Sequence, residues 1–256
     1  MQNINFSPLW RPLKISWIYP IDPNKTVLET IKSKHARKFL ATASDFLTQN
    51  NFEVTSGICS LKNYTEFLQL YNERINARGF DQLATVEWFH AKQKEGKTVE
   101  KLFIKHNNTL VGGKIVTVIN HEFRSSYKAS MQLPIFQKPR NASLGLILDY
   151  LMLNEYVKRK PTLLMAGTSR NLFGVINTLG YLIFKLRMGY LPQVISTRTS
   201  FEQQTEEPNK PIWMTFLSES PELSKPLTLY YAGDLAQFPQ LTELLKLVEI
   251  KKLNSF

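Results

Sequence analysis

Apolar residues recur at helical spacing in several stretches of the chain. Between Leu61 and about Arg78 they form one stripe, and Gly79 follows as a C-cap, so a helix is predicted there. A shorter helix is predicted from about Val86 to Lys94, and a longer one from about Thr26 to Gln49. These stripes indicate helices that each bury one side against a common core.

Strand patterns follow the helix predicted from Val86 to Lys94. Lys101 to His106 and Thr109 to Ile119 flank Asn107-Asn108, a dipeptide that tolerates the left-handed backbone of a tight turn. A β-hairpin is therefore predicted. Gly112 and Gly113 inside its second strand indicate a bulge or the close approach of another backbone.

The run from Phe123 to Leu133 alternates between apolar and polar residues. Because successive side chains of a strand point to opposite faces, the pattern places Phe123 and Tyr127 together on one face. Arg124 and Lys128 then lie on the other face, which meets water or a ligand.

A helix, a buried strand and a second helix are predicted next. The stretch from Leu144 to Arg159 has a wide apolar stripe that leaves Asp149 for water or a neighbouring chain. Thr162 to Gly167 is a short apolar run that predicts a buried strand, and Thr168 and Ser169 follow its end. In open α/β sheets ligands bind at the carboxyl ends of strands, so these hydroxyls mark a place to look for a site.

The remaining segments predict smaller elements. Four strands are predicted, at Leu13 to Tyr19, Phe52 to Ile58, Ile212 to Leu217 and Leu227 to Tyr231. A terminal helix is predicted to begin at Pro239.

The order of elements from about Ile31 to Pro192 resembles the GNAT acyltransferase fold, in the branch of FemAB-like and CelD-like enzymes. The motifs that carry the resemblance are Ser169 shortly after Gly167, and Phe184-Lys185 followed by Gly189, an aromatic residue and Pro192. It implies an α/β (α+β) protein with a GNAT-like mixed, mostly antiparallel sheet flanked by helices. The implied segments are an N-terminal strand and basic helix (1–50), the acyltransferase domain (51–192) and a C-terminal extension (193–256).

The resemblance implies N-acyltransfer to a small-molecule amine from an activated donor, acyl-CoA or acetyl-CoA. Aminoacyl-tRNA, the donor of FemAB-like peptidoglycan aminoacyltransferases, is an alternative anionic donor. A further alternative is that the domain is catalytically degenerate and only binds its ligand. A nucleic-acid-binding function is a further reading, based on Arg124, Lys128 and the basic helix, although no nucleic-acid motif accompanies them.

The resemblance places donor binding in the loop before the Leu144 helix. Acetyl-CoA-dependent members carry a glycine-rich motif there, whose amides hold the pyrophosphate at a helix N-terminus. This loop departs from that motif, since Pro139 removes one amide and Gly145 is its one glycine. The donor-binding candidates are Arg140, Asn141, Ser143, Gly145 and Thr168.

Acyl transfer needs a polarised carbonyl, a neutral amine and a proton acceptor. Lys185 is the candidate for polarisation, or else it extends to solvent as long basic side chains do. Glu122 is the candidate acceptor of the amine proton. Ser169 is the candidate donor to an acyl or phosphate oxygen, while the alternative role for Thr168 and Ser169 is to cap the next helix.

The composition limits the possible partners, metal sites and cellular location of the protein. The formal net charge of +11 favours anionic partners. Cys59 is the single cysteine, so an internal disulfide and a cysteine-based zinc site are excluded, no metal is expected, and a reducing cytoplasmic location is predicted. The most apolar stretch, Leu163 to Leu191, carries too many charges and amides to cross a membrane.

Overall fold

The computed structural model describes residues 9–77, 79, 82–136, 143–195, 200–203, 208–242 and 244–253. The chain forms two compact units. We call Ile21–Gly167 the central unit, and the terminal unit combines the residues up to Pro20 with those from Thr168 onward. The segmentation into 1–50, 51–192 and 193–256 stays a prediction.

The central unit contains a mixed, mostly antiparallel sheet. Its strand order is β3 (Phe52–Ile58), β4 (Thr98–His106), β5 (Thr109–Ile119), β6 (Glu122–Ser130) and β7 (Leu163–Arg170), the last of which enters the terminal unit at its end. Neighbours from β3 to β6 pair antiparallel, and β7 pairs parallel with β6. The predicted fold class is confirmed.

The β4–β5 hairpin forms as predicted. Asn107 and Asn108 both have a positive φ, 49° and 61°, as a tight hairpin turn requires. The β4–β5 register shifts beside Gly112, which confirms the predicted bulge, and the close neighbours of both glycines are side chains and not another backbone. A Cβ on Gly112 would lie 2.9 Å from a Leu144 methyl carbon, and one on Gly113 would lie 2.7 Å from the Phe67 ring. Helices therefore approach the two faces of β5 closely.

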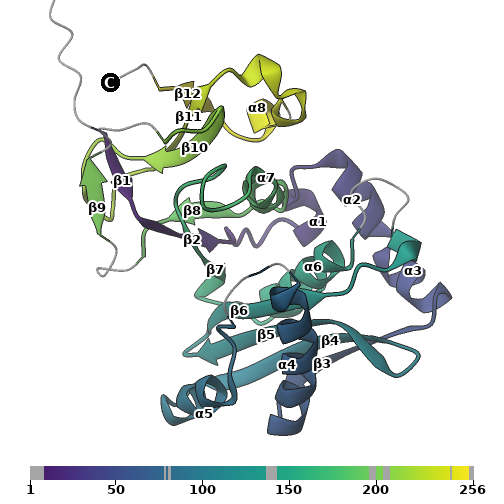
Figure 1. The fold of residues 1–256 in the computed structure, drawn as a ribbon. Coiled ribbons are helices and arrows are strands. Elements are labelled where there is room, and N and C mark those ends of the chain that lie inside the picture. Colours follow the sequence, from purple (N-terminus) through teal and green to yellow (C-terminus); the bar gives the residue numbers. More distant parts are fainter. Residues whose placement is uncertain are drawn as a thin grey trace, which may run out of the picture. The chain divides into compact units, whose positions relative to one another are not determined.

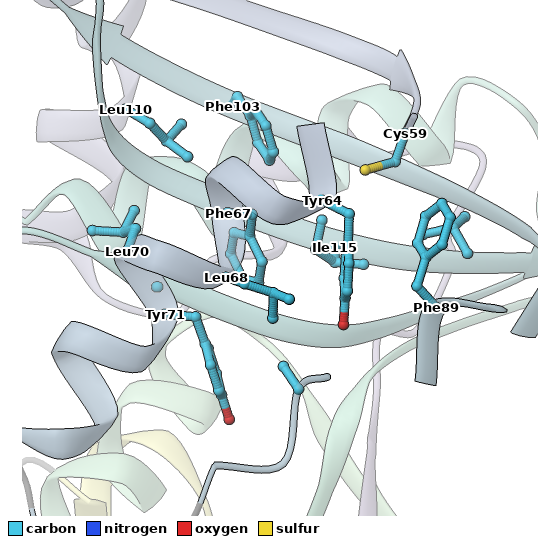
Figure 2. Packing of buried hydrophobic residues seen from close by; sticks show 13 residues of the cluster. Cys59, Tyr64, Phe67, Leu68, Leu70, Tyr71, Phe89, Phe103, Leu110 and Ile115 are labelled. Atoms are coloured by element: carbon cyan, nitrogen blue, oxygen red, sulfur yellow. The ribbon is translucent and has the colours of Figure 1, made fainter. Parts of the chain in front are cut away.

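Three predicted helices cover this sheet (Figure 1). They are α4 (Leu61–Asn76) and α5 (Val86–Lys94), which share one face, and α6 (Leu144–Val157), which packs on the other. Figure 2 shows Tyr64, Phe67 and Leu68 of α4 packed near Phe103 and Ile115 of the sheet. A short 3₁₀ helix, η1 (Pro134–Phe136), follows β6.

The single helix predicted from Thr26 to Gln49 is wrong. Three short helices occupy that stretch: α1 (Val27–Thr30), α2 (Lys34–Ala41) and α3 (Ala43–Gln49). The Ser33 hydroxyl accepts a hydrogen bond from the Ala36 N–H and starts a new helix, because serine favours the cap position over a helix interior.

The prediction that Phe123 and Tyr127 share a face is also wrong. In the β5–β6 register Ile115 faces Tyr127 and Val116 faces Ser125, so Ser126 is an extra residue in a bulge. The bulge reverses the alternation. The Phe123 ring lies 4.6 Å from that of Tyr156 on α6, whereas the Tyr127 ring lies 5.4 Å from that of Tyr71 on α4.

The terminal unit holds shorter strands and helices. Besides the end of β7 it contains β1 (Trp10–Pro12), β2 (Lys14–Ile18), α7 (Leu179–Arg187), β8 (Leu191–Gln193), β9 (Phe201–Gln203), β10 (Ile212–Leu217), β11 (Thr228–Gly233), η2 (Leu235–Gln237), η3 (Pro239–Leu241), α8 (Leu244–Leu247) and β12 (Ile250–Lys252). Strands β2, β10 and β11 match their predictions. The predicted helix from Pro239 is a 3₁₀ turn followed by the short α8.

Candidate functional site

Strands β6 and β7 pair over only part of their lengths. The pairs run from Glu122 with Leu163 to Arg124 with Met165. Beyond them β6 continues to Ser130 and β7 to Arg170 without further pairing to each other. The resemblance to GNAT enzymes implies that the sheet opens after these strands, at the place where the donor enters.

Helix α6 begins near the far end of β6. Its cap is Ser143, whose hydroxyl accepts a hydrogen bond from the Leu146 N–H at 3.1 Å. A Cβ built on Gly145 would lie 3.4 Å from Ser130 Oγ and 3.9 Å from Lys128 Nζ. The first turn of α6 therefore lies beside a hydroxyl and an ammonium group from β6, and it carries no acidic residue.

A cluster of charged groups lies behind this first turn. Asp149 of α6 is ion-paired with Lys114 of β5 through one carboxylate oxygen and with Lys128 through the other, at 2.7 Å for Lys128. The side chains of Asp149 and Lys114 are each 2% exposed, and that of Lys128 is 31% exposed. The prediction that Asp149 faces water is wrong, because its carboxylate bridges two lysines inside the unit.

Burial controls the protonation of this cluster. The pKa of Lys114 is lowered from its ordinary value to about 8, by desolvation first and also by the nearby positive charge of Lys128. The Asp149 carboxylate acts in the opposite direction and favours the charged ammonium.

Thr168 and Ser169 lie at the end of β7, within the terminal unit. The Thr168 and Ser16 hydroxyls are hydrogen-bonded at 3.3 Å, and Ser169 Oγ accepts a hydrogen bond from the Trp17 indole N–H at 3.0 Å. Neither residue caps the next helix, because β7 extends through Gly167 to Arg170 and α7 is capped by Thr178. The capping role is therefore wrong.

Lys185 belongs to α7 of the same unit. It is 5% exposed, so the alternative that it extends to solvent is wrong. Its ammonium nitrogen lies 5.2 Å from the centre of the Tyr181 ring and 4.9 Å from that of Tyr190. The Trp17 ring lies 6.3 Å from that of Tyr181. Aromatic rings therefore connect the surroundings of Lys185 with those of Ser169.

The other predicted site residues lie elsewhere. Glu122 is at the start of β6, ion-paired with Arg124 at 2.6 Å. Ser130 lies eight positions further along the strand, at a distance of roughly 26 Å. Arg140 and Asn141 fall outside the described residues. The catalytic and donor-binding roles given to all these residues stay predictions.

Sequence reasoning missed the Lys114–Asp149–Lys128 cluster as a unit. Its signal was present, since Lys114 interrupts the apolar run of β5 and Asp149 interrupts that of α6. A charged residue in such a run is rarely fully buried unless it is paired. Which acidic residue meets which basic one depended on the packing of α6 on the sheet.

Among the solved structures, that of FemX superposes with a TM-score of 0.51 at 13% sequence identity. The chain has a FemX-like fold. The match covers 75% of this chain and 62% of the FemX chain, so the chain spans about three fifths of FemX. The GNAT-like fold of the FemAB-like branch, predicted from the sequence, is confirmed at the level of the fold.

Two further structures superpose with lower TM-scores. L-PGS from Bacillus licheniformis gives a TM-score of 0.47 at 11% identity and covers 80% of this chain and 64% of its own. A tandem GNAT protein from the clavulanic acid biosynthesis pathway gives 0.42 at 13% identity, with 73% and 51% covered. No protein-family model and no curated protein matches the sequence.

Two features are absent from the part of the chain that the structure describes. Within the described residues, no helix combines the length and apolar character needed to span a membrane. In the same part of the chain, histidine, cysteine and acidic side chains do not gather in a group suited to hold a metal ion.

Proposed function

We propose that this protein is an N-acyltransferase that moves an acyl group from acyl-CoA, or a related activated anionic donor, to an amine. The observation that carries the proposal is the end of β6–β7 pairing after Arg124 and Met165, with the first turn of α6 beside β6, in a chain with a FemX-like fold. That turn presents backbone amides without intrahelical partners, and Lys128 and Ser130 lie next to it. These groups fit an anionic part of a donor.

The proposed chemistry uses few side chains. The donor supplies the activated carbonyl. The acceptor amine attacks its carbon as a neutral group, the bond to the leaving group breaks, and the amine loses a proton. Lys185 is our candidate for polarising the carbonyl oxygen, because a buried ammonium group stabilises a developing oxyanion more strongly than one in water. Glu122 is kept as a candidate proton acceptor.

Thermal unfolding tests the donor class. A ligand that binds only the folded state raises its stability by mass action. We expect CoA thioesters to raise the unfolding temperature by an amount that depends on the length of the acyl chain. If no thioester in a series from acetyl to palmitoyl changes that temperature, the acyl-CoA donor is wrong.

A pair of variants tests Lys185. Lys185→Met keeps most of the side-chain volume and removes the charge, and we expect it to lose transfer while unfolding at a temperature close to that of the parent. Lys225→Met is the control, because Lys225 is an exposed lysine of the same unit. Equal transfer by the parent and Lys185→Met would remove Lys185 from the mechanism.

A second candidate is transfer from aminoacyl-tRNA. The FemX-like fold and the net charge of +11 favour it. Phosphate contacts release counterions, so tRNA binding would weaken steeply as salt is raised. Transfer of an aminoacyl group from charged tRNA, with no response to CoA thioesters, would establish this donor. If the chain turns over neither donor, the alternative is a catalytically degenerate domain that only binds its ligand.

A further inference from the structure

Strand β3 forms a free edge of the sheet in the central unit. It pairs with β4 on one side, and in the part of the chain that the structure describes no strand pairs with its other side. An exposed edge strand presents unpaired backbone groups that a strand of another chain can bind. Natural proteins often protect such edges with lysine or proline, yet Phe52–Ile58 contains neither. The edge is therefore open to a further strand.

One hydrogen bond shows which backbone groups of β3 point away from the sheet. The Cys59 N–H donates to the Val99 carbonyl at 2.9 Å, and the β3–β4 register runs on from this pair without a shift. In an antiparallel pair, every second residue exchanges backbone hydrogen bonds with the partner strand. The backbone N–H and C=O groups of Val54, Ser56 and Ile58 therefore point away from β4.

The side chains of these three residues share one face and form a self-complementary pattern. Val54 is 40% exposed and Ile58 is 76% exposed, with the exposed Ser56 between them. When a second β3 pairs antiparallel about a two-fold axis at Ser56, each Val54 lies opposite an Ile58. The pairing covers the exposed apolar side chains of both copies and supplies partners for the outward backbone groups.

The other face of β3 carries charges that suit the same pairing. Glu53 is exposed on this face, and Lys101 of β4 lies opposite Gly57 and donates a hydrogen bond to Thr55 Oγ1 at 3.3 Å. A Cβ on Gly57 would meet no atom within 4 Å, so the surface between Lys101 and the edge is open. In the antiparallel pair, Glu53 of the second copy approaches Lys101 across Gly57. Exposed ion pairs add little stability, but they favour one register over others.

We propose that two copies of this chain form a symmetric dimer in which their β3 strands pair antiparallel, with the two Ser56 residues opposite each other. The same surface serves both copies, as a two-fold interface requires. The pairing joins the sheets of the two central units into one and removes the free edge. This inference goes beyond acyl transfer and is independent of which donor the chain uses.

The test measures the mass of the full chain by sedimentation equilibrium over a range of concentrations. We expect the parent to show twice the mass of one chain and to dissociate on dilution. Ser56→Lys places two like charges directly opposite each other, so we expect it to raise the dissociation constant of the dimer more than about tenfold. Ser56→Glu is expected to have the same effect for the same reason.

A mixture of the two variants tests the position of the two-fold axis. Lysine in one copy then faces glutamate in the other, and we expect the mixture to form dimers although neither variant does so alone. Thr109→Lys is the matched control, because Thr109 is an exposed strand residue of the same sheet that belongs to β5 and lies off the free edge. If a Ser56 variant does not fold, Ile58→Ser tests the same edge, since it removes an exposed apolar side chain.

Each outcome decides the proposal. Loss of the dimer in both Ser56 variants and its return in their mixture, with a dimeric Thr109→Lys, supports it. A parent chain that stays monomeric at about 0.1 mM overturns it, because a specific interface assembles at that concentration. A dimer that both Ser56 variants retain uses another surface and overturns it too, and a mixture that stays monomeric rules out the axis at Ser56. The donor class is tested separately by thermal unfolding.

Discussion

The Lys114 ammonium and the Asp149 carboxylate form an ion pair in which both side chains are almost completely enclosed. They come from β5 and α6, so the pair links the sheet of the central unit to the helix that covers it. Replacing either partner therefore changes both the packing of α6 and the charge that surrounds Lys128.

The two partners are expected to respond differently to replacement. Asp149→Asn leaves two buried or partly buried ammonium groups without their carboxylate, and removing one partner of a buried pair costs about 3–5 kcal/mol. Lys114→Met leaves Asp149 paired with Lys128 and is expected to cost clearly less. Urea unfolding measures both free energies, and an equal or smaller loss for Asp149→Asn would contradict the bridging role of the carboxylate.

Lys114 also predicts a pH dependence of stability. Its pKa is about 8 in the folded chain, against 10.5 as the ordinary value. Between these values the unfolded chain binds more protons, so raising the pH stabilises the folded state by at most about 1.4 kcal/mol per pH unit. The unfolding free energy of Lys114→Met minus that of the parent is therefore expected to be highest below pH 8 and to fall as pH rises toward 10.5.

The unfolding free energy of the parent must be compared with that of Lys114→Met, because other groups titrate in a similar range of pH. Burial raises the pKa of Cys59 to about 11 and that of Tyr127 to about 12, and both shifts destabilise the folded state at high pH. These effects are common to the parent and the variant and cancel in the difference. A difference in unfolding free energy that is constant from pH 7 to pH 10 would contradict the lowered pKa of Lys114.

Gly145→Ala separates stability from donor binding. Alanine favours a helix over glycine by up to about 1 kcal/mol, so the variant is expected to be as stable as the parent or slightly more stable. Its methyl group would lie 3.4 Å from Ser130 Oγ and 3.9 Å from Lys128 Nζ, beside the groups that we propose bind an anionic part of the donor. Calorimetry is expected to show weaker pyrophosphate binding together with an unchanged or raised unfolding temperature. Gly180→Ala, in the first turn of α7, is the control substitution.

Ser169 predicts an effect on stability that is independent of catalysis. Its hydroxyl accepts the hydrogen bond of the fully buried Trp17 indole. Ser169→Ala leaves that N–H without this acceptor, which is expected to cost about 1–3 kcal/mol in urea unfolding. The double variant Ser169→Ala with Trp17→Phe is expected to lose less than the sum of the single changes, and additive losses would argue against the bond.

Sequence patterns alone predict the helices α4, α5 and α6, the β4–β5 hairpin and the GNAT-like order of elements. These features depend on periodicity and on turn chemistry such as that of Asn107-Asn108, which act over a few neighbouring residues. The same local patterns could not reveal the break at Ser33, where capping overrode a continuous apolar stripe, or the end of β7, which extends past Gly167.

Long-range packing set the arrangement of the candidate site residues. The bulge at Ser126 arises from the register of β6 against β5, and it places Phe123 and Tyr127 on opposite faces. The pairing of Lys114 with Asp149 joins residues 35 positions apart, and that of Lys128 with Asp149 joins residues 21 apart. Such contacts form only when α6 packs on the sheet, because the cost of burying each charge is offset by a partner that local sequence does not specify.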